Sequence, residues 1–110
     1  MDWSQIRNVK MPESMMLEVP SGWEAVVQKA LSRLSSLDEA IEILQVKEKL
    51  GGLRIYYAPC SDRADEIIRD AELECSRTCD TCGQPGTRVQ GTWIRVLCDT
   101  HRKRFENDDD

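Results

Sequence analysis

The sequence predicts an α+β fold in the order helix, β-hairpin, helix, followed by a C-terminal zinc-ribbon-like module. Apolar residues recur with helical spacing in two segments, and a Gly-Gly pair separates two runs rich in β-branched and aromatic residues. Cys-x-x-Cys and Cys-x-x-His steps then follow near the C-terminus. The predicted divisions are an N-terminal arm at 1–20, an α-β-β-α domain at 21–78, a zinc-binding module at 79–105 and an acidic tail at 106–110.

Length and composition restrict the class of protein. The chain has 110 residues and a formal net charge of −5. Because small cores are only marginally stable, a bound metal ion would help such a domain to fold. No run approaches the roughly 20 apolar residues of a membrane span, and the N-terminus lacks the basic-then-apolar pattern of a secretory signal. We therefore expect a cytoplasmic protein with no membrane partner, in which thiols stay reduced.

The arm at 1–20 is expected to pack on the domain. Trp3, Ile6 and Val9 recur with helical spacing, whereas the stretch at 15–19 has the composition of an extended segment. Partial disorder of the arm is the alternative.

The first helix is predicted to begin at Ser21, which forms the pattern of a capping box with Glu24 three residues later. A continuous apolar stripe follows, which indicates a helix packed on a core and covering one face of the hairpin. The stripe consists of Trp23, Val26, Val27, Ala30, Leu31, Leu34 and Leu37.

A β-hairpin is predicted around Gly51-Gly52, which separates β-rich runs at 41–50 and 53–58. If the two glycines form the turn, one face of the hairpin carries a single acid among apolar side chains. That face consists of Leu44, Val46, Glu48, Leu50, Leu53, Ile55 and Tyr57. We expect it to lie on the core.

The opposite face of the hairpin is basic, and we call it the outer hairpin face: Lys47, Lys49, Arg54 and Tyr56. In the predicted register Lys49 lies opposite Arg54, and Lys47 lies opposite Tyr56. Like charges directly opposite each other are destabilising unless an anion neutralises them. Three anions remain possible: an acidic segment of the chain itself, an acidic surface of a partner protein, or a nucleic-acid backbone. The outer hairpin face is therefore the candidate partner-binding surface.

The second helix is predicted to begin at Ser61-Asp62, because serine is a favoured N-cap and acids in the first turn complement the helix dipole. Its apolar stripe consists of Ala64, Ile67, Ile68, Ala71 and Cys75. We interpret Cys75 as a small buried hydrophobic residue and Cys60 as an inert free thiol. The outer face is acidic, which is typical of a solvated helix: Asp62, Asp65, Glu66, Asp70, Glu72 and Glu74.

Four candidate metal ligands follow this helix: Cys79, Cys82, Cys98 and His101. Each pair would lie on one tight turn, and two short strands expected at 87–89 and 92–97 would bring the turns together. Gly83 permits the sharp bend that the first turn needs. Because four protein ligands leave no position for a substrate, the pattern indicates a structural Zn²⁺ rather than a catalytic one.

Other chemistries fit the cysteines less well. A redox-active Cys-x-x-Cys is the alternative, but the pair does not follow a strand and open a helix as in thioredoxin-like proteins. A zinc deaminase is disfavoured because no His-x-Glu element lies upstream. Basic residues near the ligands would favour thiolates and would extend a nucleic-acid-binding surface. They are Arg95, Arg102, Lys103 and Arg104.

The run from Gln45 to Tyr56, the Cys79-x-x-Cys82-Gly83 step and the run from Trp93 to Cys98 together resemble small uncharacterised proteins of bacteria and prophages. Their pattern is close to Val-Lys-Glu-Lys-Phe-Gly-Gly-Leu-Arg-Phe-Tyr, followed by Cys-x-x-Cys-Gly and a second Cys pair. The likeness spans roughly residues 21–101, and Leu50 and Ile55 stand where that family often has phenylalanine. The resemblance implies no known activity. The genomic setting of that family suggests conflict between phage, plasmid and host, as an inhibitor, an immunity protein or an anti-defence factor.

The sequence as a whole therefore predicts a non-enzymatic, zinc-stabilised protein that regulates another macromolecule by binding it, with a protein as the favoured partner. The alternative is a nucleic-acid-binding zinc-ribbon regulator that uses the outer hairpin face together with the basic residues of the module.

Overall fold

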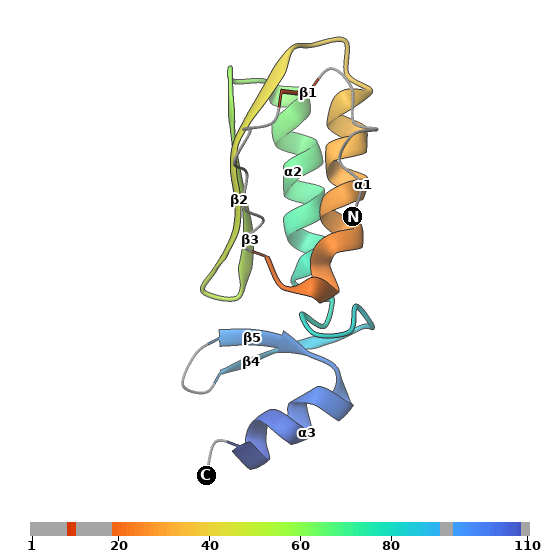
Figure 1. Ribbon diagram of the computed structural model, residues 1–110, viewed down its shortest axis with the longest axis vertical. Coiled ribbons are helices and arrows are strands. Elements are labelled where there is room, and N and C mark those ends of the chain that lie inside the picture. Colours follow the sequence, from red (N-terminus) through yellow and green to blue (C-terminus); the bar gives the residue numbers. More distant parts are fainter. Residues whose placement is uncertain (1–8, 11–18, 91–93, 109–110) are drawn as a thin grey trace.

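The structure is a computed structural model that describes residues 9–10, 19–90 and 94–108. Two parts follow each other along the long axis of the molecule (Figure 1). The first part consists of strands β1 (Val9–Lys10), β2 (Ile41–Lys49) and β3 (Gly52–Ala58), the short 3₁₀ helix η1 (Ser21–Trp23), and helices α1 (Glu24–Ser35) and α2 (Asp62–Cys75). The second consists of β4 (Thr87–Gln90), β5 (Ile94–Leu97) and α3 (Asp99–Asp108). The predicted order of helix, hairpin, helix and C-terminal module is confirmed.

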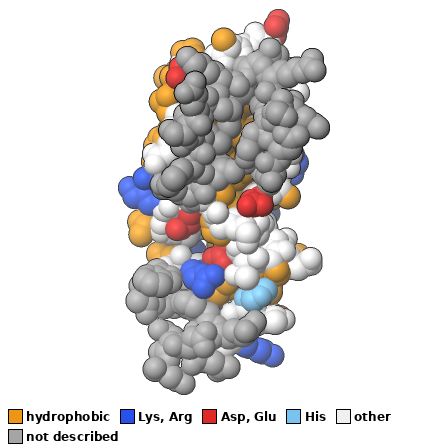
Figure 2. All heavy atoms as spheres, viewed as in Figure 1, with side chains coloured by type: hydrophobic (Ala, Val, Ile, Leu, Met, Phe, Trp, Pro, Cys, Tyr) orange, Lys and Arg blue, Asp and Glu red, His pale blue; other side chains and the backbone are white. Residues whose placement is uncertain are grey.

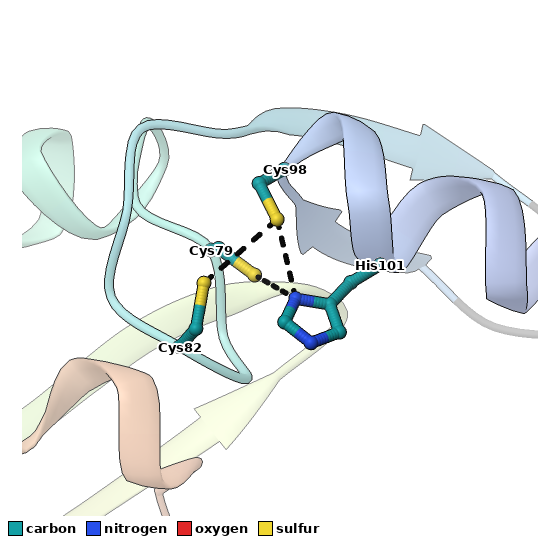
Figure 3. A group of neighbouring side chains, drawn as sticks. All are labelled: Cys79, Cys82, Cys98 and His101. Atoms are coloured by element: carbon teal, nitrogen blue, oxygen red, sulfur yellow. Dashed lines mark hydrogen bonds between the residues drawn. The ribbon is translucent and has the colours of Figure 1, made fainter.

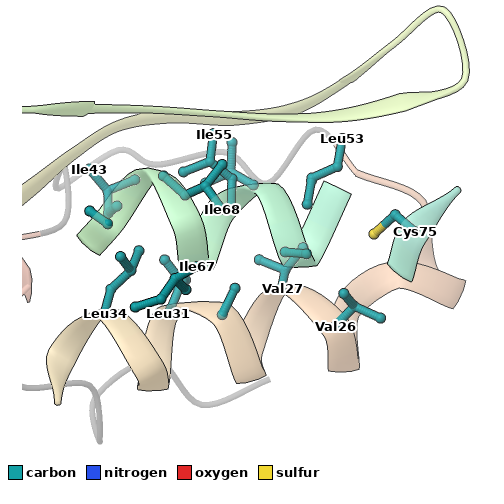
Figure 4. Packing of buried hydrophobic residues seen from close by; sticks show 14 of the residues in the cluster. Val26, Val27, Leu31, Leu34, Ile43, Leu53, Ile55, Ile67, Ile68 and Cys75 are labelled. Atoms are coloured by element: carbon teal, nitrogen blue, oxygen red, sulfur yellow. The ribbon is translucent and has the colours of Figure 1, made fainter. Parts of the chain in front are cut away.

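The core lies between a sheet and two helices. The strand order is β1-β2-β3, and α1 and α2 pack side by side against one face of the sheet (Figure 1). Every residue of both predicted apolar stripes is buried. Figure 4 shows side chains of α1, α2 and the two long strands meeting in one cluster. Helical spacing in the sequence therefore identified the helical half of the core correctly.

The two helices begin differently. Ser61 caps α2 as predicted, because its Oγ accepts a hydrogen bond from the Ala64 N–H at 3.2 Å. The capping box predicted for α1 is wrong. Trp23 occupies the N-cap position of α1 without a side-chain cap, and the Glu24 N–H donates to the Ser21 carbonyl within the 3₁₀ turn. The Ser21 hydroxyl instead donates to the Thr81 carbonyl of the C-terminal part at 3.4 Å.

The hairpin turn also differs from the prediction. Leu50 and Gly51 form the two-residue turn, while Gly52 already pairs with Lys49 inside the ladder. Both turn residues have positive φ, 53° at Leu50 and 78° at Gly51, as a type I′ turn requires. The turn thus lies one residue earlier than predicted, and the pairing near it is shifted by two residues, so that Arg54 faces Lys47 and not Lys49.

A β-bulge between Ile43 and Gln45 shifts the pairing by one further residue along β2. Because the bulge inserts one residue, both Ile43 and Val46 reach the core although they are three positions apart. Leu44 is exposed as a result, contrary to its predicted place on the buried face. In the observed register Val46 lies directly opposite Ile55, and both are buried. Because the two registers differ by two residues, both place Val46, Leu53 and Ile55 on the core side of the hairpin.

The arm contributes a strand where it is described. Val9, assigned above to a helical spacing, instead pairs in parallel with Ile41 at the edge of the sheet. Val19 is partly buried against the core, as expected for an arm that packs on the domain. Trp3, Ile6 and residues 15–18 lie outside the described residues. No described helix is long and apolar enough to cross a membrane.

Candidate metal centre

The first ligand pair lies on a tight turn directly after α2. A bridge between Thr78 and Pro85 closes this loop, and the Gly83 N–H donates to the Cys79 carbonyl at 3.0 Å. Gly83 has a φ of 82°, a conformation that glycine adopts without strain. The predicted role of this glycine in the bend is confirmed.

The second ligand pair lies on a helix and not on a second turn. Cys98 immediately precedes α3, and His101 belongs to its first turn, where the Arg102 N–H donates to the Cys98 carbonyl at 2.8 Å. Helix α3 was not predicted, although Asp99 at its start complements the helix dipole. Residues 106–108, expected in an acidic tail, also belong to α3.

The four predicted ligands converge, as Figure 3 shows. Their ligand atoms all lie within 4.8 Å of one another. The Sγ atoms of Cys82 and Cys98 are 3.8 Å apart, and His101 Nδ1 is 3.5 Å from Cys79 Sγ and 3.2 Å from Cys98 Sγ. With Zn–S bonds of about 2.3 Å and Zn–N bonds of about 2.0 Å, a tetrahedral ion places two sulfurs about 3.8 Å apart and sulfur and nitrogen about 3.5 Å apart. The arrangement fits a tetrahedral metal ion.

The environment of Cys79 favours the thiolate that metal binding requires. Burial by itself would raise the pKa of this thiol. Hydrogen bonds from the backbone N–H groups of Cys98, Cys82 and Thr81 outweigh burial and lower the pKa of Cys79 to about 6. Three sulfurs and one imidazole nitrogen thus form a candidate metal site in which all four positions are held by protein.

A salt bridge between Asp80 and Arg95, which the sequence did not predict, lies beside this site. Asp80, between the first two ligands, is buried, and its carboxylate accepts two hydrogen bonds from Arg95 of β5 at 3.1 and 2.8 Å. The Thr81 hydroxyl also donates to Asp80, at 2.9 Å. This contact raises the pKa of Arg95 and ties the first ligand turn to the β-hairpin that leads to the second ligand pair. Asp80 within Cys-Asp-Thr-Cys was visible in the sequence, but its partner 15 residues away was not.

Backbone contacts join the metal site to the α/β core. The Gly22 N–H donates to the Asp80 carbonyl at 2.9 Å, and the Trp23 Nε1–H donates to the Thr78 carbonyl at 2.9 Å. The approach is so close that a Cβ on Gly22 would lie 2.2 Å from the Cys79 carbonyl oxygen. Figure 2 shows acidic and basic side chains together at this level of the molecule, next to the one histidine. The candidate metal site is thus built against the start of α1.

The outer hairpin face is partly neutralised from within the chain. Lys47 lies opposite Arg54, so a like-charge pair exists, although its members are not the predicted Lys49 and Arg54. Arg54 Nη1 lies 3.9 Å from a carboxylate oxygen of Glu72 in α2. In the ladder Tyr56 pairs with Gln45 and not with Lys47 as predicted. Lys47 Nζ nevertheless lies over the Tyr56 ring, 6.0 Å from its centre. Within the described part of the chain, an ion pair therefore neutralises Arg54 but neither of the two lysines.

The acidic face of α2 is likewise engaged by neighbouring elements. Glu74 and Asp70 form ion pairs with Lys29 and Arg33 of α1, at 2.6 and 3.2 Å. These exposed pairs contribute little to stability. Glu74 and Asp70 therefore neutralise basic side chains of α1 and not those of the outer hairpin face.

The remaining predicted residues are also placed. Cys75 is buried, and burial raises the pKa of its thiol to about 12, so it is a neutral core residue as predicted. Cys60 is exposed. Arg102 lies 4.0 Å from Asp99 within α3, and Lys103 is exposed. The Arg104 side chain is not among those that the structure describes.

Comparison with protein-family models, curated proteins and solved structures found no match for this chain.

Proposed function

We propose that this chain is a non-enzymatic, zinc-stabilised regulator that acts by binding another protein. The four convergent ligands support a structural Zn²⁺, because none of the four tetrahedral positions is left for a substrate. We place the protein in the cytoplasm, where the thiolates that such a site needs stay reduced.

The observation that carries the binding role is the charge on the outer hairpin face. Lys47 directly faces Arg54 across the ladder, and among the described residues the one ion pair on this face joins Arg54 to Glu72. An acidic surface on a partner would neutralise the remaining lysines and remove the repulsion between the strands. Tyr56, which is exposed beside them, supplies apolar contact area.

Nucleic-acid binding is the second candidate, carried by the same face and by basic residues of the module. Arg95 is engaged by Asp80, which removes one of the four cations expected to extend that surface. For this reason a protein partner remains the primary proposal. Following the resemblance stated above, we extend it to an inhibitor, immunity or anti-defence role linked to phage or mobile elements.

Metal content tests the zinc assignment. Elemental analysis of protein purified without chelator is expected to give about one zinc per chain, because four ligands complete one tetrahedral ion. The double variant Cys79→Ser with Cys98→Ser should not bind zinc. The variant Cys60→Ser, at an exposed cysteine, should bind zinc as the wild type does. If wild-type protein purified without chelator contains no zinc, the zinc assignment is wrong.

Partner capture tests the binding role. Zinc-loaded protein should retain one stoichiometric protein from a lysate of its source cells, and Lys47→Glu with Lys49→Glu should abolish capture. Arg63→Glu with Arg69→Glu on α2 makes the same change in charge at two other exposed positions and should leave capture intact. Equal capture by both double variants would exclude the outer hairpin face. A shift of mixed DNA or RNA at low salt, with affinity falling steeply as salt rises, would favour the nucleic-acid alternative.

A further inference from the structure

A groove lies between the turn of the β2–β3 hairpin, the 3₁₀ turn η1 and the metal module, and it encloses about 780 Å³. We call it the tip groove. Its apolar lining comes from Pro20, Trp23, Leu50 and Ile94. Arg88 Nη2 donates to the Leu50 carbonyl at 3.4 Å, so the hairpin turn is held beside β4. Because side chains alternate along a strand, the lining residue Glu48 lies on the face of the hairpin opposite Lys47 and Lys49.

Leu50 is an unusual residue for this position. A type I′ turn favours asparagine or glycine, and a left-handed backbone costs roughly 1–2 kcal/mol for residues with a larger side chain. Core packing does not offset this cost, because 67% of Leu50 remains exposed. A strained position that presents an apolar side chain into a groove is typical of a contact with a ligand.

Glu48 is the second unusual residue, and it is the single acid that the sequence placed on the core-facing side of the hairpin. It lies opposite the fully buried Leu53 and lines the tip groove. Its carboxylate accepts a hydrogen bond from the Gly51 N–H at 2.8 Å. Among the described residues no ion pair involves Glu48, and Arg95, which also lines the groove, is bound to Asp80. The groove thus combines the exposed Leu50 with the Glu48 carboxylate, while its other two charged residues, Asp80 and Arg95, pair with each other.

We propose that the tip groove binds a short segment of a partner protein in which a large apolar side chain stands next to a lysine or arginine. The apolar side chain packs on Leu50 and Ile94, and the cation pairs with Glu48. Charge complementarity selects this occupant, because Glu48 repels phosphates and acidic peptides. The inference rests on the proposed role in protein binding, but it assigns the contact to a different surface.

The test uses zinc-loaded full-length protein and an array of labelled twelve-residue peptides on a Gly/Ser background. Each peptide carries one Leu or Phe next to one Lys, and matched peptides carry Glu in place of Lys or Ser in place of the apolar residue. Fluorescence anisotropy is expected to detect binding only of peptides that keep both residues. Leu50→Asn and Glu48→Gln should each weaken this binding at least tenfold. Arg63→Gln with Arg69→Gln on α2 should leave it unchanged, and Lys47→Gln with Lys49→Gln shows whether the peptides bind the outer hairpin face instead.

Leu50→Asn is informative because asparagine suits the turn, so the variant should keep or raise the thermal midpoint while it loses binding. A lowered midpoint would overturn the proposal, since the chain itself would then pack on Leu50. Dissociation of a wild-type dimer by Leu50→Asn in sedimentation experiments would also overturn it, in favour of a second copy as the occupant. If peptide binding depends only on Lys47 and Lys49, the tip groove is excluded while the proposed function stands. If the peptides bind as expected but no cellular protein is captured, the proposed function is wrong while the tip-groove proposal stands.

Discussion

The positive φ angles at Leu50 and Gly51 decide the hairpin register. A type I′ turn can form at either dipeptide, Leu50-Gly51 or Gly51-Gly52, and only the second has two residues that adopt this backbone freely. The chain uses the first, which aligns Val46 with Ile55 in the core. This turn carries a local cost at one leucine, and the two-residue difference between the registers leaves the same side chains on the core face.

We predict that Leu50→Asn raises the free energy of unfolding by about 1 kcal/mol, because asparagine adopts the left-handed conformation at lower cost. Urea unfolding followed by circular dichroism measures the change. Gly51→Ala is the opposite control, since its φ is 78° and a Cβ would lie 2.7 Å from Ile94 Cγ2. A gain in stability for Gly51→Ala would contradict this account of the turn.

Cys75 should make stability depend on pH in the alkaline range. Burial raises the pKa of its thiol from 9.0 to about 12. The stability that the buried neutral thiol contributes is fully present below pH 9. Above pH 9 the thiol loses its proton in the unfolded chain but keeps it in the folded chain. The free energy of unfolding should therefore fall by up to about 1.4 kcal/mol per pH unit towards pH 12. Urea unfolding from pH 8 to 11 should show a shallower fall for Cys75→Ala. Parallel curves for the two proteins would show that Cys75 contributes nothing.

At the scale of the elements, η1 has a role that its three residues do not suggest. It begins α1, and at the same time its backbone contacts the first ligand turn through Gly22. The expected capping box would have required a serine free to turn back onto its own helix. The contact with Thr81 engages that serine elsewhere.

Gly22→Ala is expected to destabilise the folded protein by about 2 kcal/mol and to weaken zinc binding. An added Cβ would overlap the Cys79 carbonyl oxygen at 2.2 Å and the Asp80 carbonyl carbon at 2.6 Å, and two backbone segments would have to separate. Chemical unfolding and competition with a zinc-binding dye measure the two effects. Gly52→Ala is the matched control, because its nearest neighbour is the end of the flexible Arg54 side chain at 3.3 Å. Zinc affinity unchanged by Gly22→Ala would separate η1 from the metal site.

At the scale of the whole molecule, the metal module is continuous with the core. Val96 of β5 belongs to the same buried cluster as Trp23 and the helices. The Trp23 indole bonds to the segment that precedes Cys79. Loss of the metal should therefore loosen more than the ligand loops.

Removing zinc with a chelator is expected to lower the thermal midpoint of the entire chain. Free zinc at a hundred times its Kd stabilises the folded state by about 2.7 kcal/mol, and each kcal/mol corresponds to about 4–8 °C for a small domain. Hydrogen exchange should also show reduced protection of α1 amides such as those of Val27 and Leu31. Full protection of α1 in the zinc-free protein would mean that the module folds independently of the core.

Patterns within single elements were predictable from the sequence, because each depends on neighbours close along the chain. The apolar stripes of α1 and α2, the Ser61 cap and the bend at Gly83 belong to this group. The convergence of the four ligands was also predictable, since two short spacings suit one tetrahedral ion. The helix α3 was missed because the Cys-x-x-His spacing fits a turn and a first helical turn equally well.

The sequence by itself determined the order of the elements, the core faces of both helices and the residues of the candidate metal site. Only the tertiary structure decided the strand register, the bulge at β2, the start of α1 and the contact between Gly22 and the metal loop. The physical reason is that these features depend on burial and backbone approach between segments as far apart as Gly22 and Asp80. Such long-range contacts override the local preferences of a Gly-Gly pair or a capping serine.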